Sequence, residues 1–377
     1  TGTTTRHFCK TRGALLKHGS FLLIRSIKME EAKKNGLRLF KSAALVAAIL
    51  ASNITQAEMF NTGKVLATGG VSMIDGAGGG GITPWATITG YATRDGINGN
   101  VHYTYAPLAN YTLHSIGAAV GFWDRFELSY TKSSLTTGST FNTLGLVFDT
   151  AGGLTDESAG VPVDTGIEPF NTTIEMDIVG AKVRVFGEAI YDSDNLIPQV
   201  AIGGFYKKNK NDELLTTLKA AKTKDWEAYI SATKIFFPIN TLVNITARYS
   251  AANQTGLTGF GGPDGDDKEI RPEISLAYLL RKDTVIGVEW AKHGDNVSGQ
   301  SVDVAGIDLT ELQPTLGALG LGNLAGTLTQ NESDWYDAFI AYFPNKNLSM
   351  TFAYAMLGDI TITPDQHGFY LSLQASF

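Results

Sequence analysis

Charged side chains occur at alternate positions of several otherwise apolar segments, and they are the residues best placed to do chemistry. In the segment 242–250, Arg248 shares its parity with Asn244 and Thr246, whereas Val243 and Ile245 take the other parity. Because successive side chains of a β-strand point to opposite faces, this pattern predicts a strand with one polar and one apolar face. If such strands close into a barrel in a membrane, the polar face lines the lumen. The predicted lumen-lining residues are Glu127, Glu175, Asp177, Lys182, Arg184, Glu227, Arg248, Arg271, Glu273, Glu289 and Asp337.

These predicted lumenal charges are of both signs, which leaves two roles open. They could pair across the lumen and seal it, since buried charges need partners. They could instead line a wet passage and set its selectivity. In a passage, the residues expected to tune it are Arg248, Arg271, Glu273 and Glu289.

Other arrangements that could carry chemistry are less specific. His102, His114, His293 and His367 show no metal-ligand spacing, so no metal site is expected. A histidine near Ser115 could imitate the wall-mounted active site of a barrel lipase, but serines are too numerous for this proximity to be informative. We therefore expect no catalytic residue and no cofactor, and a lipid hydrolase is the least favoured function.

The glycine-rich run 76–81 reads GAGGGG, which invites comparison with a phosphate-binding loop. No Gly-Lys-Ser/Thr follows the run, and no helical pattern leads away from it. It is therefore predicted to form a turn or a close backbone approach inside a barrel mouth.

Segments in which polar and apolar residues alternate recur from Lys64 to the C-terminus, and they are the strands that must position these residues. Tight polar turns and longer loops connect them alternately. Counting back from Phe377 predicts an all-β, antiparallel, up-and-down transmembrane barrel of about 14 strands. The fallback is 12 strands and a separate N-terminal segment. The predicted strands are 63–68, 85–93, 100–107, 111–122, 125–136, 173–190, 197–208, 226–236, 241–250, 269–280, 284–293, 335–343, 348–357 and 367–377.

Within 173–185 the alternation changes parity once. Ile174 and Met176 are at even positions, but Val183 and Val185 are at odd positions. A β-bulge near 179–180, where a glycine tolerates the geometry, is predicted to keep all of these side chains facing outward.

Aromatic residues are expected at the two interfaces of the membrane, where amphipathic rings are favoured. Trp85, Trp226, Trp290 and Trp335 fall near the predicted external ends of their strands. The predicted periplasmic ends carry Trp123, Phe343 and Phe377.

The N-terminal part reads as a targeting segment. No apolar run reaches the roughly 18–20 residues that a membrane-spanning helix needs. A basic stretch from Met29, an apolar run at 42–51 and small residues ending at Ala57 are typical of a secretory signal peptide. We expect 1–28 to be upstream sequence, 29–57 to be a signal peptide cleaved after Ala57, and 58–377 to be one barrel domain.

Without residues 1–57, the chain keeps 20 basic and 35 acidic residues, a formal net charge of −15. Nucleic-acid binding is not expected, because it requires basic patches that neutralise phosphates. The single cysteine, Cys9, lies in the segment predicted to be removed. The exported chain would then have no disulfide, no thiolate metal site and no cysteine nucleophile.

Among the long connections, which include 137–171 and 294–333, the stretch 304–328 is unusually apolar. Pro314 and several glycines discourage a long helix there. The stretch could fold inward as a constriction, cap the mouth or form an external hairpin. An apolar loop that leads to a lumen would suit capture of a hydrophobic small molecule.

Three stretches also resemble a known family. They are ATGGVSMIDGAGGGGITPWATITGY at 67–91, AANQTGLTGFGG at 251–262, and FPNKNLSMTFAYAMLGDITITPDQHGFYLSLQASF at 343–377. Together they resemble the proteobacterial family known as domain of unknown function 3034. The resemblance implies an exported, barrel-like protein, and it carries over no catalytic residue.

These patterns predict a monomeric barrel in the bacterial outer membrane that passes or binds small molecules. Its expected partners are outer-membrane lipid, a small-molecule cargo, and the barrel-assembly machinery, which would recognise the C-terminal strand ending at Phe377. The alternative is a closed structural or adhesion barrel that acts through its external loops.

Overall fold

The computed structural model describes residues 63–94, 96–138, 172–187, 196–304, 307–308 and 328–377. All of them belong to one compact unit, Asn53–Phe377. No helix within these ranges is long and apolar enough to cross a membrane. The predicted signal peptide, residues 139–171 and most of 304–328 lie outside the described residues, so the expectations for them stay predictions.

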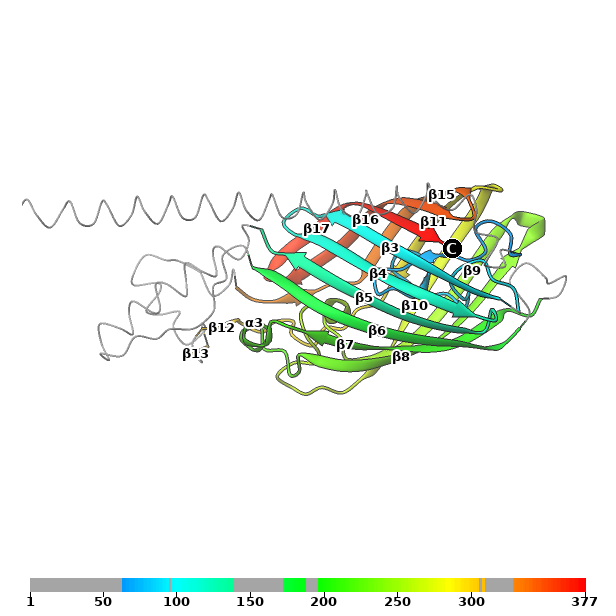
Figure 1. Cartoon of the computed structure of the whole chain (residues 1–377). Coiled ribbons are helices and arrows are strands. Elements are labelled where there is room, and N and C mark those ends of the chain that lie inside the picture. Colours follow the sequence, from blue (N-terminus) through cyan, green and yellow to red (C-terminus); the bar gives the residue numbers. More distant parts are fainter. Residues whose placement is uncertain (1–62, 95, 139–171, 188–195, 305–306, 309–327) are drawn as a thin grey trace, which may run out of the picture. The chain divides into compact units, whose positions relative to one another are not determined.

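Twelve antiparallel strands close into a barrel (Figure 1). Each pairs with the next barrel strand along the chain, and the last pairs with the first, from Leu371↔Tyr105 to Ser376↔Asn100. The barrel strands are β3 (Ile97–Pro107), β4 (Thr112–Phe122), β5 (Phe126–Thr136), β6 (Thr173–Phe186), β7 (Gln199–Asn209), β8 (Lys224–Phe236), β9 (Thr241–Ser250), β10 (Glu269–Arg281), β11 (Thr284–Ala291), β15 (Trp335–Asn345), β16 (Leu348–Thr361) and β17 (Thr363–Ser376).

The two ends of the barrel differ in their connections. At one end, here called the turn end, tight turns follow β4, β8, β10 and β15, and the one after β8 includes the 3₁₀ turn η2 (Phe237–Ile239). The opposite end, here called the loop end, carries the short elements α3 (Asp212–Thr217), η3 (Gln254–Gly256), β12 (Asp303–Val304), β13 (Ile307–Asp308) and β14 (Asn331–Glu332). The connection between the predicted strands 348–357 and 367–377 is shorter than predicted. It is a tight turn at Ile362, because β16 and β17 extend to meet there.

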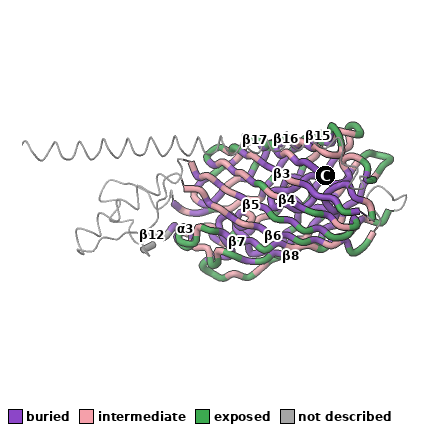
Figure 2. Tube along the Cα trace, in the orientation of Figure 1, coloured by how far each residue is buried: buried purple, intermediate pink, exposed green. Residues whose placement is uncertain are grey.

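Residues 64–92, here called the plug, run through the lumen instead of forming the first two strands of the 14-strand prediction. Every residue from Thr68 to Ala92 is buried (Figure 2). The plug contains one small hairpin, β1 (Val71–Ser72) and β2 (Gly78–Gly79), and is otherwise irregular. The 14-strand count was wrong because these residues offer no continuous apolar face for lipid, which membrane-spanning strands need. The fallback of 12 strands and a separate N-terminal segment is confirmed.

The glycine-rich run at 76–81 lets the plug backbone approach the wall closely, as expected. A Cβ atom built on Gly80 would overlap the Glu289 carboxylate, and one on Gly81 would overlap the Tyr370 hydroxyl. Gly76 has a φ of +97°, which side-chain-bearing residues rarely adopt. The run is therefore shaped by the wall that surrounds it.

Strand β6 has no bulge at Gly180, which corrects the predicted faces of its first half. Its pairing with β5 runs without a shift from Phe126↔Val183 to Thr136↔Thr173. Consequently Ile174, Met176 and Ile178 face the lumen and are buried, whereas Glu175 and Asp177 point outward. These two carboxylates do not line the lumen. The apolar trio instead belongs to a buried hydrophobic cluster that also contains Leu135 and Leu215.

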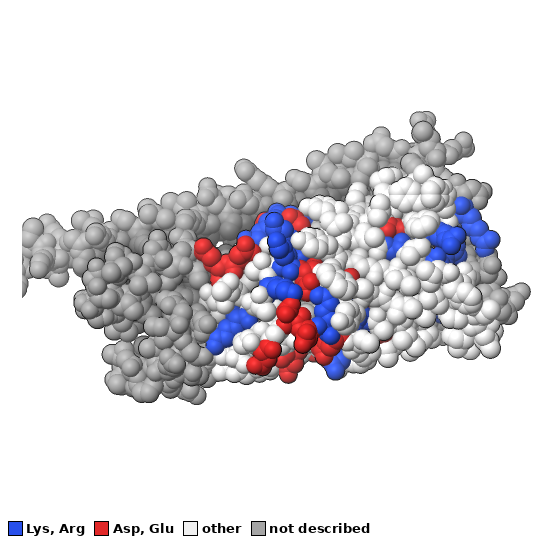
Figure 3. Space-filling model, turned by 90° about the horizontal axis from the view of Figure 1, so that it is seen from below, with Lys and Arg blue, Asp and Glu red and all other residues white. Residues whose placement is uncertain are grey.

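The outer face of the barrel is largely apolar. Large side chains exposed along the strands include Leu128, Val179, Ile245, Leu276 and Phe352. On the face seen in Figure 3, charged side chains gather in a band and a separate group, with uncharged surface between them. An uncharged zone between polar ends is typical of a barrel that spans a membrane.

The aromatic residues of the predicted girdle divide between the two faces of the wall. Trp123 and Trp226 are exposed on the outside, and Trp290 and Phe377 are partly exposed. The other three are corrected, because Trp85 belongs to the plug, and Trp335 and Phe343 have the inward parity of β15. All three are buried and cannot contact lipid.

We expect Gly80→Ala to lower the free energy of unfolding by about 1–3 kcal/mol, because the added methyl group overpacks the contact with Glu289. Chemical unfolding of the refolded barrel measures this. Gly299→Ala is the control, since its Cβ would meet no atom within 4 Å and only its φ of +73° opposes the change. An equal loss in both variants would contradict close packing at Gly80.

Candidate functional site

Two carboxylates hold the plug backbone from opposite sides of the barrel. Glu127 on β5 accepts hydrogen bonds from the backbone N–H groups of Gly78 (3.0 Å) and Thr89 (2.7 Å). Glu289 on β11 accepts the backbone N–H groups at positions 81 and 82, at 2.6 and 2.9 Å. Strands β5 and β11 lie six places apart in the twelve-strand order, so the glycine-rich run is held between facing walls.

Lys182 on β6 satisfies plug carbonyls beside the first carboxylate. Its Nζ donates to the carbonyl oxygens of Gly78 and Thr87, both at 2.7 Å, and forms an ion pair with Glu127 at 3.1 Å. The ammonium group is therefore surrounded by acceptors, which a buried cation requires. Wall carboxylates thus accept hydrogen bonds from plug N–H groups, and a wall lysine donates hydrogen bonds to plug carbonyl groups.

Asp75 of the plug lies at the centre of a buried charge network. Its carboxylate is 2.8 Å from Lys207 Nζ and 3.5 Å from Arg248 Nη1. Glu227 contacts the same two cations, at 2.9 and 3.2 Å. Glu273 accepts from Arg248 Nε at 2.5 Å. The network contains three carboxylates and two cations, and four of these five groups belong to the wall.

The same Lys207 also reaches the loop end. Residues 251–262, here called the mouth loop, follow β9 and are almost entirely buried. Lys207 Nζ donates to the carbonyl oxygen of Thr255 at 2.7 Å, and Asn209 Nδ2 donates to that of Leu257 at 2.8 Å. Trp335 Nε1 donates to Gln254 Oε1 at 2.8 Å. One lysine thus joins the plug, the wall and the mouth loop.

Two acidic residues lie side by side on the part of the wall formed by β11 and β15. Glu289 and Asp337 are directly paired residues of β11 and β15. Tyr370 donates its hydroxyl to Asp337 Oδ2 at 2.8 Å, and Asp337 Oδ1 has no hydrogen-bond partner. Among the residues that the structure describes, no lysine or arginine forms an ion pair with either carboxylate. The charge of the lumen is therefore uneven, because the inward-facing lysines and arginines of the wall lie on β6 to β10.

Uncharged contacts complete the fit of the plug. The carbonyl oxygen of Pro84 accepts from Ser231 at 3.0 Å and from Thr246 at 2.8 Å. Ser275 accepts from Trp85 Nε1 at 2.9 Å and also contacts the hydroxyl of Thr83. These wall hydroxyls take the place of water around an irregular buried backbone.

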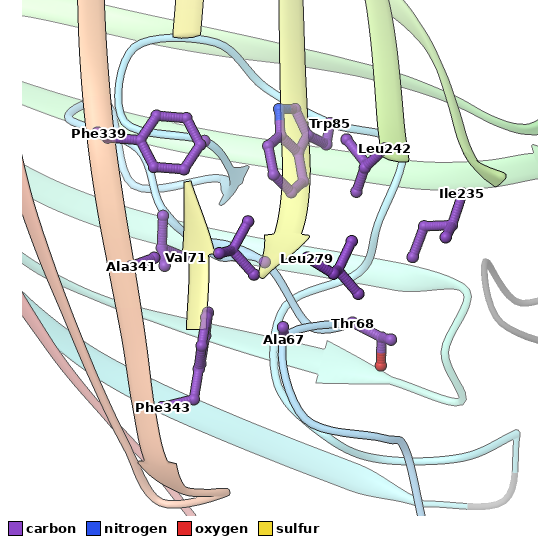
Figure 4. Close-up of a pocket in the computed structure, with 13 residues that line it drawn as sticks. Ala67, Thr68, Val71, Trp85, Ile235, Leu242, Leu279, Phe339, Ala341 and Phe343 are labelled. Carbon is purple, nitrogen blue, oxygen red and sulfur yellow. The ribbon is translucent and has the colours of Figure 1, made fainter. Parts of the chain in front are cut away.

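At the turn end the plug meets the wall through apolar side chains, around a cavity of ≈ 20 Å³ (Figure 4). Val71 and Trp85 from the plug face Leu242 and Phe339 from the wall. The only hydroxyl in the lining, that of Thr68, already donates to a carbonyl at 2.6 Å. A cavity of this size has room for about one water, which would need two or more polar partners. The gap is therefore a dry packing space that helps to close this end.

The structure places nine of the eleven predicted lumen-lining residues on the inner face. Glu127, Lys182, Glu227, Arg248, Glu273, Glu289 and Asp337 lie in the contacts above. Arg184 reaches Asp124 at 3.4 Å, and Arg271 donates to the carbonyl oxygen of Ala252 at 2.5 Å. The other two, Glu175 and Asp177, form exposed ion pairs on the outside.

Sequence reasoning missed Asp75, Lys207 and the buried ion pair between Lys64 and Asp124, at 2.6 Å. Asp75 could not be recognised from the sequence, because polar and apolar residues do not alternate regularly in the plug. Lys207 could have been found, since it shares the inward parity of Phe205 on β7. Its neighbour in the sequence is another lysine, which obscured the alternation.

The residues considered for hydrolysis serve other contacts. Ser115 donates to the carbonyl oxygen of Ile74 in the plug at 2.7 Å. His102 contacts Thr131 at 3.2 Å, and His114 contacts the Tyr103 hydroxyl at 2.8 Å. Within the described ranges, no group of three or more His, Cys, Asp or Glu could hold a metal ion.

Glu332 of β14 is linked to the mouth loop through Asn296. Its Oε2 accepts the backbone N–H of Asn296 at 3.2 Å, and Asn296 Nδ2 donates to Asn253 Oδ1 in the mouth loop at 2.7 Å. Burial raises the pKa of Glu332 to about 8, although nearby Arg271 opposes the shift. The carboxyl group is therefore neutral near pH 7 in the folded barrel.

We expect Asp75→Asn to cost about 1–3 kcal/mol of stability, because Lys207 and Arg248 each lose one of the carboxylates that surround them in a buried site. Asp177→Asn is the matched control. Both carboxylates lie 2.8 Å from a lysine, but the Asp75 pair is 2% and 0% exposed, whereas the Asp177 pair is 28% and 41% exposed. The exposed pair should be worth about 1 kcal/mol or less. Denaturant unfolding of both variants measures the difference, and equal losses would contradict the central role of Asp75.

We also expect Glu332 to make the barrel less stable as pH rises from about 4.5 to about 8. The unfolded chain ionises at the lower value and the folded chain only at the higher one, so the folded state binds more protons in this window. Glu332→Gln should flatten this part of the stability curve, which unfolding at a series of pH values measures. An unchanged slope would contradict the burial of a neutral carboxyl group.

Solved structures with similar architecture are outer-membrane proteins. The KdgM porin has a TM-score of 0.39 at 10% identity, over 74% of this chain and 99% of its own. The NanC porin has a TM-score of 0.40 at 8% identity, over 74% and 98%. Outer membrane phospholipase A from Escherichia coli has a TM-score of 0.35 at 11% identity, over 73% and 89%. At these values the likeness concerns barrel architecture and carries no function across.

The sequence comparisons give a family without an activity. No curated protein matches the sequence. The family described as protein of unknown function (DUF3034) matches residues 68–374, which include most of the plug and all but the last two residues of the final strand. This range confirms the resemblance that the three sequence stretches suggested. The chain belongs to the DUF3034 family.

Proposed function

We propose that this protein is an outer-membrane barrel that passes or binds small molecules, and that the plug holds it closed at rest. The observation that carries the proposal is the polar interface between plug and wall. Ion pairs and hydrogen bonds can be exchanged for contacts with water when a segment moves. A permanently filled interior would be at least as stable with apolar packing in place of buried ion pairs.

The outer face supports a membrane location. The terminal strand β17 exposes Phe369 and Leu371 on the outside and buries Ser372 and Gln374 inside. Apolar side chains are similarly exposed along most of the other barrel strands. We infer that the turn end is periplasmic and the loop end external, as in other barrels with short periplasmic turns. Recognition of β17 by the barrel-assembly machinery and a monomeric state are parts of the same proposal.

The lining that the plug covers indicates the kind of solute. With residues 64–92 displaced, the wall presents Arg248, Arg271, Glu273 and Glu289 together with serine and threonine hydroxyls. Such a surface suits small polar molecules better than hydrophobic ones. We propose that these four charged residues set the selectivity.

A permanently closed structural barrel is the second candidate, and the two ends of the lumen favour it. Apolar contact around Trp85 closes the turn end, and the mouth loop closes the loop end. In this case the plug would act as a core, and the protein would act through its external loops.

A reversible crosslink between plug and wall separates the two candidates. In a chain carrying Cys9→Ser, Thr83→Cys and Ser275→Cys place sulfur atoms where two hydroxyls are in contact. We expect no conductance in planar bilayers when the pair is oxidised and conductance when it is reduced. The control pair, Thr104→Cys with Ser372→Cys, joins two wall strands whose hydroxyls are 2.8 Å apart, and should conduct in both states.

Deletion of residues 64–92 completes the test. The proposed function requires both conductance in the deletion variant and detectable opening of the intact chain. A deletion variant that conducts beside an intact chain that never opens at any voltage would instead support the closed structural barrel.

A further inference from the structure

Strands β7 and β8 carry an ordered ladder of outward-facing pairs near the loop end. Along the strands from the loop end toward the turn end, the directly opposed residues are Lys208 and Lys224, then Tyr206 and Trp226. Next come Gly204 and Ala228, and then Ile202 and Ile230. The ladder thus passes from cationic to aromatic to small to aliphatic along one line on the outer face.

The two lysines at the top of the ladder are unusual in their pairing. Both are exposed, and like charges directly opposite each other on neighbouring strands are destabilising. The neighbouring lysines Lys210 and Lys222 do have acidic partners, which are Asp177 and Asp266 respectively. Within the part of the chain that the structure describes, no carboxylate forms an ion pair with Lys208 or Lys224. An anion between them would remove the repulsion.

The nearest carboxylate across the sheet does not fill this role. Asp177 on β6 is the other cross-strand neighbour of Lys208. Its oxygens are engaged by Lys210 Nζ at 2.8 Å and by the Tyr130 hydroxyl at 3.1 Å. The lysine pair therefore offers two ammonium groups to an outside partner.

The residues below the lysines are suited to a lipid. Tyr206 and Trp226 are 48% and 51% exposed, and aromatic rings of this kind favour the interface between headgroups and acyl chains. Ile202 and Ile230, at 46% and 47% exposure, present aliphatic surface on the same line. Between these pairs, the glycine–alanine pair has no side-chain atom beyond Cβ. The sequence of chemistries matches a phosphate, a glycerol region and an acyl chain in that order.

We propose that the β7–β8 ladder binds one phosphate-bearing membrane lipid, with the phosphate between Lys208 and Lys224 and an acyl chain along Ile202 and Ile230. The inference rests on the membrane location within the proposed function, but not on passage of any solute. Free phosphate would use only the lysine pair and would leave the apolar part of the ladder unexplained. Charge complementarity and the continuous apolar line therefore favour a lipid.

The test measures lipid retention by native mass spectrometry of the full chain released from nanodiscs. The nanodiscs contain phosphatidylcholine with a minor fraction of phosphatidylglycerol, with or without added inorganic phosphate. We expect one phosphatidylglycerol molecule to be retained in preference to phosphatidylcholine. Lys208→Met with Lys224→Met should weaken this retention by about tenfold.

The matched control is Lys282→Met with Lys292→Met, which removes the same charge from two exposed lysines outside the ladder. It should leave retention unchanged. A second variant, Ile202→Ser with Ile230→Ser, should weaken retention while keeping both lysines. Equal retention in wild type and the Lys208/Lys224 variant would overturn the proposal. So would complete displacement of the lipid by inorganic phosphate, which would identify a site for free phosphate alone.

Flotation with vesicles separates this inference from the proposed location. A chain that does not float would contradict the membrane location itself. A chain that floats but shows no preference for phosphatidylglycerol would overturn the lipid site and leave the proposed function in place.

Discussion

The constraint on which this structure depends is the satisfaction of an irregular backbone buried inside a barrel. Residues 64–92 form little regular secondary structure, and the turns within this segment satisfy only part of its N–H and C=O groups. The wall supplies many of them, with Glu127 and Glu289 as acceptors and Lys182 as a donor. Several charged residues of the inner face therefore form hydrogen bonds with the plug backbone, which also fixes where their side chains lie.

Much of the barrel could be predicted from the sequence, because period-two alternation reports directly on two different environments. In β9 and β10 the inward set is polar and the outward set apolar, so Arg248, Arg271 and Glu273 were placed correctly. Strand β6 shows where this reasoning ends. Its inward face is apolar at Ile174 and Met176 and charged at Lys182, because the lumen itself has apolar and polar zones. The expectation of a uniformly polar lumen then required a bulge that does not exist.

The centre of the candidate site was beyond the sequence for a different reason. Alternation says which way a side chain points, but it does not say what fills the space that it points into. Asp75 lies in a segment without periodicity, and its partners come from β7 and β9, more than a hundred residues away. Trp85 was likewise predicted to lie at a membrane interface because it is a tryptophan near a predicted strand end, although it is buried in the lumen. Only the closed barrel brings these residues together.

The seam between β3 and β17 places a condition on assembly. The plug precedes β3 in the chain, whereas β17 is the last strand, so these two strands pair across most of the sequence. Pairings of such high sequence separation are slow to form, because the intervening chain must first be ordered. A segment with as many wall contacts as the plug is most easily enclosed while the sheet is still open. The order of strand pairing would then decide whether the barrel closes around its own N-terminal segment or around water.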